Sequence, residues 1–149
     1  MLLDTMNQRP FIVYAPVQSD RTADSLAELD RELRELLQER PVGEEEVLTS
    51  KKRNTLTLPG RWETARAVAG DIAQMVRFGF SDDYWERYAD LISAVSAEET
   101  NAAARSELKP DQLIWVVVGD LATIEDEVRA LEWGEIDLMD VDGRLLTVH

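Results

Sequence analysis

The amino-acid sequence predicts an α+β fold in which helices pack on one face of a small mixed or antiparallel sheet. Two runs rich in β-branched and aromatic residues, 10–18 and 112–118, indicate strands. Between them, apolar residues recur at helical spacing in several consecutive segments. Residues 135–140 alternate between acidic and apolar side chains, which is typical of a further strand. We expect residues 1–149 to form a single domain, with residues 1–9 poorly ordered.

The two long apolar runs should occupy different places in the sheet. Pro10 and Pro16 lack a backbone N–H, so the first strand is expected at an edge or at a bulge. Residues 113–118 are all apolar, which predicts a central strand buried on both faces. After the third strand, Asp142-Gly143 predicts a tight hairpin turn.

Six segments show the periodicity and the end signals of helices. In the first of them, five leucines form one stripe that should pack in the core. Ser96 and Glu99 match the capping box that begins the fifth. Pro59-Gly60 is expected to break the chain between the second and the third. The predicted helices are 23–40, 43–58, 61–79, 82–95, 96–108 and 123–131.

The third predicted helix has an apolar side built from alanines and larger aliphatic residues. Its alanines and Gly70 predict a close approach to a neighbouring element. We therefore expect this side to be covered by the rest of the fold. The residues on it are Ala65, Val68, Ala69, Ile72, Met75 and Val76.

Two other clusters on the helices each allow a structural and a functional interpretation. The glutamates at 44–46 fall in the first turn of a helix, where the helix dipole favours negative charge. A metal site is less favoured there, because no histidine or further carboxylate is spaced to complete a ligand shell. Tyr84, Trp85 and Tyr88 have the spacing of a helix–helix contact rather than of a ligand platform.

Composition excludes several classes of protein. The chain carries 30 acidic and 16 basic residues, and its formal net charge of −14 repels the phosphates of nucleic acids. Its one basic cluster, Lys51-Lys52-Arg53, is expected to be a solvated helix face. No apolar run approaches the roughly 20 residues needed to span a bilayer, and a signal peptide is not evident. We expect a soluble protein that binds neither nucleic acid nor membrane, with cytoplasm and periplasm both open.

Residues that commonly carry enzyme chemistry are scarce. Cysteine is absent, and the one histidine, His149, ends the chain as a frayed tail or tag remnant. Gly119-Asp120 follows a predicted strand but lacks the nucleotide-binding patterns. Asp137, Asp140 and Asp142 suit a charged edge strand and its turn better than a calcium site. We therefore predict no catalytic residue, no metal ligand and no cofactor in this chain, and its substrate-binding residues stay unknown.

Three segments stand out in order along the chain: Phe11–Ala23, Leu58–Thr64 and Leu113–Asp120. Their sequences are FIVYAPVQSDRTA, LPGRWET and LIWVVVGD. Together with the helix after Ser81-Asp82-Asp83-Tyr84, they resemble the C-terminal part of a domain of the insulinase/pitrilysin-type zinc peptidases, a processing-peptidase-like family. The resemblance covers residues 10–143.

In that family, one domain holds zinc through His-x-x-Glu-His and a downstream Glu, and a similar zinc-free domain closes the chamber. This chain has no such histidine pair, so it resembles the zinc-free half. The zinc-free half of the family also supplies an Arg and a Tyr upstream of the first segment. Here Arg9 has no Tyr at that spacing, because Tyr14 is five residues on. The resemblance thus implies a partial domain that lacks its first strands and helix.

The function implied is that of a non-catalytic C-terminal region of a zinc-peptidase-like protein. It would help to form the substrate chamber in the full-length protein or with a zinc-bearing partner, and the chain alone would not be an enzyme. The expected partners are a second copy or a zinc-bearing peptidase domain or subunit, with a peptide substrate in the full assembly. The alternative is an autonomous protein-interaction module that uses an open sheet edge, near strand 11–18 or the C-terminal hairpin.

Overall fold

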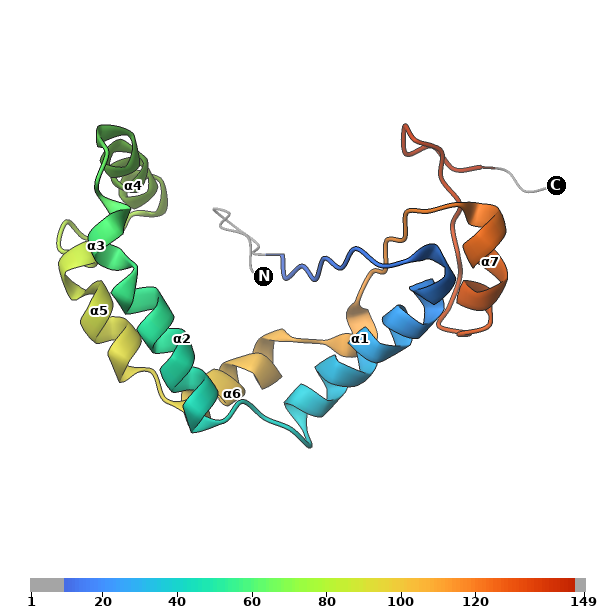
Figure 1. Cartoon of the computed structure of the whole chain (residues 1–149), viewed down its shortest axis with the longest axis horizontal. Helices are drawn as coiled ribbons and strands as arrows, with labels where there is room; N and C mark the ends of the chain where they lie inside the picture. Colours follow the sequence, from blue (N-terminus) through green and yellow to red (C-terminus); the bar gives the residue numbers. More distant parts are fainter. Residues whose placement is uncertain (1–9, 147–149) are drawn as a thin grey trace. The chain divides into compact units, whose positions relative to one another are not determined.

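Figure 1 shows the computed structural model of the chain, which describes residues 10–146. Within that range the regular secondary structure is helical, and β-pairing is limited to isolated bridges such as the antiparallel one between Met139 and Leu145. The described part of the chain is therefore all-α, and the predicted α+β fold with a small sheet is wrong.

All six predicted helices are present, with ends that move by a few residues. Pro59-Gly60 does not break the chain but lies inside a one-turn helix, where Pro59 is near the N-terminus and its missing N–H costs no helical hydrogen bond. The helices are α1 (Thr22–Leu37), α2 (Glu44–Leu56), α3 (Leu58–Arg61), α4 (Ala65–Phe78), α5 (Tyr84–Ala94), α6 (Ala97–Glu107) and α7 (Leu121–Arg129), with 3₁₀ turns η1 (Ser19–Arg21) and η2 (Pro110–Gln112).

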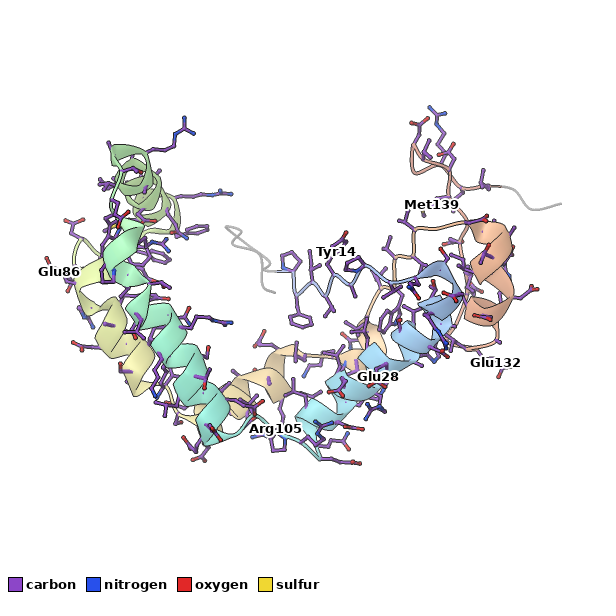
Figure 2. The ribbon with its side chains drawn as sticks, viewed as in Figure 1. Tyr14, Glu28, Glu86, Arg105, Glu132 and Met139 are labelled. Atoms are coloured by element: carbon purple, nitrogen blue, oxygen red, sulfur yellow. The ribbon has the colours of Figure 1, made fainter. Side chains whose placement is uncertain are left out.

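The predicted strands are extended segments without a ladder. Residues 10–18 run into η1 (Figure 1), and the side chain of Tyr14, labelled in Figure 2, is 85% exposed. For residues 113–118, no backbone hydrogen bond to another described residue is recorded. Alternating and β-branched residues favour the extended conformation, but a strand becomes stable only when another strand pairs with it. The sequence pattern predicted the backbone conformation of these segments and not their pairing.

The described residues divide into two compact units, residues 10–14 with 34–112 (unit 1) and residues 15–33 with 113–146 (unit 2). The single domain expected over residues 1–149 stays a prediction. The expected poor order of residues 1–9 and the frayed tail at His149 lie outside the described residues.

Unit 1 is held together by helix packing and by a few long-range polar contacts. Helices α2 and α5 pack against each other (Figure 1), and Lys51 of α2 donates to the carbonyl of Ser93 at 2.9 Å. The Asn101 side chain accepts from the backbone N–H of Val42 and donates to its carbonyl, both at 2.9 Å. This pair of bonds fastens the segment before α2 to α6, because the amide satisfies both backbone groups of Val42 at once.

Helix α6 begins with the predicted capping box. The backbone N–H of Glu99 donates to Ser96 Oγ at 3.1 Å, and Glu99 Oε2 accepts from the Ser96 N–H at 2.8 Å. The N–H and the hydroxyl of Ser96 also hold the pKa of the Glu99 carboxyl below its ordinary value. The sequence therefore identified both the start of this helix and the atoms that stabilise it.

Substituting Ser96 with alanine is expected to lower the free energy of unfolding by about 1 kcal/mol, because a helix N-terminal N–H loses its acceptor. Urea unfolding followed by far-ultraviolet circular dichroism measures the change. Ser106→Ala is the matched control, since the Ser106 hydroxyl bonds to a carbonyl late in the same helix and caps nothing. Equal effects of the two substitutions would contradict the capping role.

Unit 2 has a small packed centre around α7. Ile124 is buried, and a β-carbon added at Gly119 would lie 3.2 Å from Ile124 Cδ1, so the chain passes close to this helix. Trp115 and Trp133 are in ring contact, with centroids 5.1 Å apart. The segment between α7 and Trp133 turns at Glu132, which has a positive φ of 54° (Figure 2).

The predicted hairpin turn at Asp142-Gly143 is confirmed as a local turn. The Gly143 N–H donates to the Asp140 carbonyl at 3.0 Å, and Gly143 has a φ of +77°, which favours glycine. The Asp140 carboxylate accepts from the backbone N–H groups of Asp142 and Arg144, both at 2.9 Å. Asp140 therefore organises the turn, as expected of a turn aspartate.

The packed centres are small for the amount of apolar sequence. In the described part, no large side chain is fully buried. The buried apolar residues are Ala23, Val47, Ala97 and Ile124. Many aliphatic side chains consequently remain on the surface, and their grouping indicates where the chain can contact other molecules.

Candidate protein-interaction surface

Helix α4 presents its apolar side to solvent, contrary to prediction. Ile72 is 55% exposed and Val76 is 79% exposed, whereas Asp71, the one acidic residue of the helix, is only 8% exposed. The expected close neighbour at Gly70 is also not found, since a β-carbon added there would meet nothing within 4 Å. We call the exposed set the α4 strip, which comprises Ala65, Val68, Ala69, Ile72 and Val76.

The inward face of α4 is fixed by an ion pair on Asp71. Arg61, at the end of α3, donates from Nε to Asp71 Oδ2 at 2.7 Å and from Nη2 to Oδ1 at 2.6 Å. Trp62 Nε1 donates to Oδ2 at 2.7 Å. The hydrogen bonds from Arg61 and then Trp62 lower the pKa of the Asp71 carboxyl, although burial acts in the opposite direction. This geometry holds the carboxylate ionised and sets the rotation of α4 about its axis.

Aromatic side chains pack beside this ion pair. The Arg61 guanidinium carbon lies 4.3 Å from the ring centroid of Trp85, a cation–π contact. Trp85 also makes an edge-on contact with Trp62, at 5.7 Å between centroids, and a tilted one with Tyr88 at 5.1 Å. Tyr84 stacks on Phe80 at 4.3 Å. The three aromatic residues of α5 thus serve in packing, against one another and against Arg61, Trp62 and Phe80, rather than as a ligand platform.

One long edge of the α4 strip is basic. Arg66 and Arg77 are 11 residues apart, close to three full helical turns, so they lie on the same side of the helix. No ion pair is recorded for either within residues 10–146, although Arg77 lies over the ring of Phe78. Arg53 and Arg105 of the described part likewise make no ion pair, whereas its remaining arginines pair with a carboxylate: Arg21, Arg31, Arg34, Arg40, Arg61, Arg87, Arg129 and Arg144.

A second exposed apolar group lies in unit 2. The residues of segment 113–118 alternate, with Leu113, Trp115 and Val117 half-buried and the intervening ones exposed. Ile114 is 89% exposed, Val116 is 83% and Val118 is 94%. The prediction of a central strand buried on both faces is therefore wrong for this chain. We call the three exposed side chains the 114–118 row.

Within residues 10–146, the residue clusters that the sequence analysis singled out do not come together as a metal-binding site. Glu46 accepts from the Gly43 N–H at 2.9 Å and so caps α2, in agreement with the structural interpretation of residues 44–46. Among residues 10–146, no group of three acidic or histidine side chains is arranged to hold a metal ion. No helix in that range is long and apolar enough to cross a membrane.

Surface depressions offer little for chemistry. One lies along α2, from Glu45 to Arg53. Another is lined by Asn54, Thr57, Arg61 and Tyr88, but its one charged group is already paired with Asp71.

Comparison of the chain with protein-family models, with characterised proteins and with solved structures finds no match. The resemblance to zinc peptidases therefore rests on the three sequence segments alone.

Proposed function

We propose that this chain is the non-catalytic C-terminal region of a zinc-peptidase-like protein and helps to form its substrate chamber, within a longer protein or together with a zinc-bearing partner. The observation that carries the proposal is the 114–118 row, three aliphatic side chains more than four-fifths exposed on an extended segment. Leaving these side chains exposed to water costs roughly 25 cal/mol of free energy per Å² of apolar surface. A surface supplied by another part of the assembly would remove that cost.

The resemblance supplies the identity of the assembly. Segments Phe11–Ala23, Leu58–Thr64 and Leu113–Asp120 occur in the order found in the zinc-free half of these peptidases. The third of them contains the 114–118 row, so a segment that carries the resemblance also has uncovered apolar side chains. In this proposal the zinc and its histidine ligands belong to the other half, and the present chain shapes the chamber wall.

Alone, the chain is expected to bind no stoichiometric zinc and to hydrolyse no peptide. Zinc prefers nitrogen and sulfur ligands, and this sequence has no cysteine and one histidine at its end. Metal analysis after dialysis, together with a quenched-fluorescence peptide assay, measures both. One tightly held zinc per chain with chelator-sensitive cleavage would contradict the expectation.

The proposed assembly is tested by isolating the tagged chain from cells that express it and assaying the complex for zinc and for chelator-sensitive peptide cleavage. Val116→Asp should lose the zinc-bearing partner and the activity, because it places a charge in the 114–118 row. Val141→Asp is the matched control, since Val141 is fully exposed in the same unit but outside the row. Retention of partner and activity by Val116→Asp, or a complex without zinc, would overturn the proposal.

The second candidate function is an autonomous protein-interaction module, and the α4 strip favours it. The form that used an open sheet edge is excluded for the described residues, because they contain no sheet. A homodimer stays a prediction, now through apolar side chains rather than paired strands. Light scattering over a concentration series measures it, and a monomer at high micromolar concentration would contradict it.

A further inference from the structure

We propose that the α4 strip is a docking face for an acidic amphipathic helix of a partner protein. The inference goes beyond the proposed function, because it depends on α4 alone and holds whether or not the partner is a peptidase. The occupant would cover Val68, Ile72 and Val76 with its own apolar side chains. Its acidic residues would meet Arg66 and Arg77.

The strip is held outward by the fold of unit 1. Asp71 lies about 100° around the axis of α4 from Ile72 and accepts hydrogen bonds from Arg61 and Trp62 at 2.6–2.7 Å. Rotating α4 to bury Ile72 would break these bonds and leave a buried charge without its partner, which is strongly unfavourable. The exposed apolar face is therefore a fixed feature of the unit rather than one of several equivalent packings.

The strip has the shape that a second helix needs. Val68, Ile72 and Val76 follow one another at intervals of four residues, so they form a continuous ridge. Ala65 and Ala69 beside them are small and leave room for a close approach. Ridges of this kind pack into the groove of a facing helix, which is a common mode of peptide recognition.

The charge on the edge of the strip defines the occupant. Arg66 and Arg77 lie about 16 Å apart along the helix axis, and no ion pair is recorded for them in the described part. A second copy of α4 in antiparallel packing would bring Arg66 of one chain against Arg77 of the other, which is repulsive. Glutamates or aspartates along the matching edge of a partner helix would instead complement both arginines.

The test measures the fluorescence anisotropy of two labelled synthetic peptides of about 18 residues, a length at which designed helices form. Both carry the same leucine and alanine face, and their edge positions are glutamate in one and lysine in the other. The glutamate peptide is expected to bind the full chain about tenfold more tightly. Non-specific attraction predicts the opposite order, because the chain has a net charge of −14.

Two variants assign the binding to α4. Ile72→Glu should abolish binding of the glutamate peptide, and since Ile72 is exposed, circular dichroism should show an unchanged fold. The double variant Arg66→Glu with Arg77→Glu should reverse the preference, so that the lysine peptide binds more tightly. Val141→Glu, at an exposed position in unit 2, should change neither affinity.

Several outcomes would overturn the proposal. One is equal binding of the two peptides, and another is unchanged binding to the Ile72→Glu variant. Self-association of the chain that Ile72→Glu abolishes would assign the strip to a second copy. Binding to phosphatidylcholine vesicles that Ile72→Glu abolishes would assign it to a lipid surface.

Discussion

Replacing Trp85 with alanine is expected to lower the free energy of unfolding of unit 1 by about 3 kcal/mol, toward the lower end of the range for tryptophan truncation. Its ring contacts Trp62, Tyr84 and Tyr88 and lies under the Arg61 guanidinium. Removing the indole would leave a cavity beside the Asp71 ion pair and release several aromatic contacts at once. Urea unfolding monitored by circular dichroism gives the change.

Two further variants test whether the loss of stability in Trp85→Ala comes from the ring contacts of Trp85. Trp85 Nε1 is buried without a hydrogen-bond partner among the described residues, so Trp85→Phe keeps an aromatic ring and loses no hydrogen bond. The Trp85→Phe substitution should lower the free energy of unfolding clearly less than Trp85→Ala does. Trp133→Ala removes a tryptophan that is 45% exposed and should cost only about 1 kcal/mol. Unfolding of Trp85→Ala at the wild-type urea concentration would show that the aromatic contacts do not hold unit 1 together.

The helices were predictable because their signals are local. Leucine spacing in α1, the Ser96–Glu99 capping box and the glutamates that begin α2 all act within a few residues. Each signal predicts backbone conformation without reference to the rest of the chain. For the same reason the turn at Asp142-Gly143 was found, because Asp140 and Gly143 satisfy it locally.

The predicted sheet failed because strand pairing is not local. The run 113–118 has the composition of a buried strand, and its side chains do alternate between half-buried and exposed. Whether such a segment is buried depends on a second strand, which the described residues do not provide. High β-propensity alone therefore predicted the extended conformation and overestimated its burial.

The orientation of α4 was missed because apolar residues were assumed to face inward. Asp71 breaks this rule, since a buried carboxylate is tolerated when Arg61 and Trp62 satisfy it. A signal was present in the sequence: Asp71 is the sole acidic residue of α4, and the pair Arg61-Trp62 precedes it by 10 and 9 residues. Neither residue could be matched to Asp71 without knowing how the chain turns between α3 and α4.

The Asp71→Ala variant is expected to lower the free energy of unfolding by about 2–3 kcal/mol, which is less than for a fully buried ion pair because Arg61 is partly exposed. The substitution removes the acceptor for both Arg61 and Trp62. Asp90→Ala is the matched control, since Asp90 is an exposed aspartate of α5 in the same unit, and it should cost less than about 0.5 kcal/mol. Similar losses for the two variants would contradict a structural role for the ion pair.

The same ion pair should make unit 1 sensitive to acid. The Arg61 hydrogen bonds hold the pKa of Asp71 in the folded state below its value in the unfolded chain, which is about 3.9. The stabilisation is therefore complete above that pH and is lost as the pH falls through the lower, folded-state pKa. In the Asp71→Asn variant, the free energy of unfolding should fall less steeply below about pH 4 than in the wild type. Part of the fall will remain, because the pKa values of Asp83 and Glu99 are also lowered in the folded state. A wild-type pH profile in Asp71→Asn would show that Asp71 titrates alike in both states, and the fixed outward face of α4 would then need another cause.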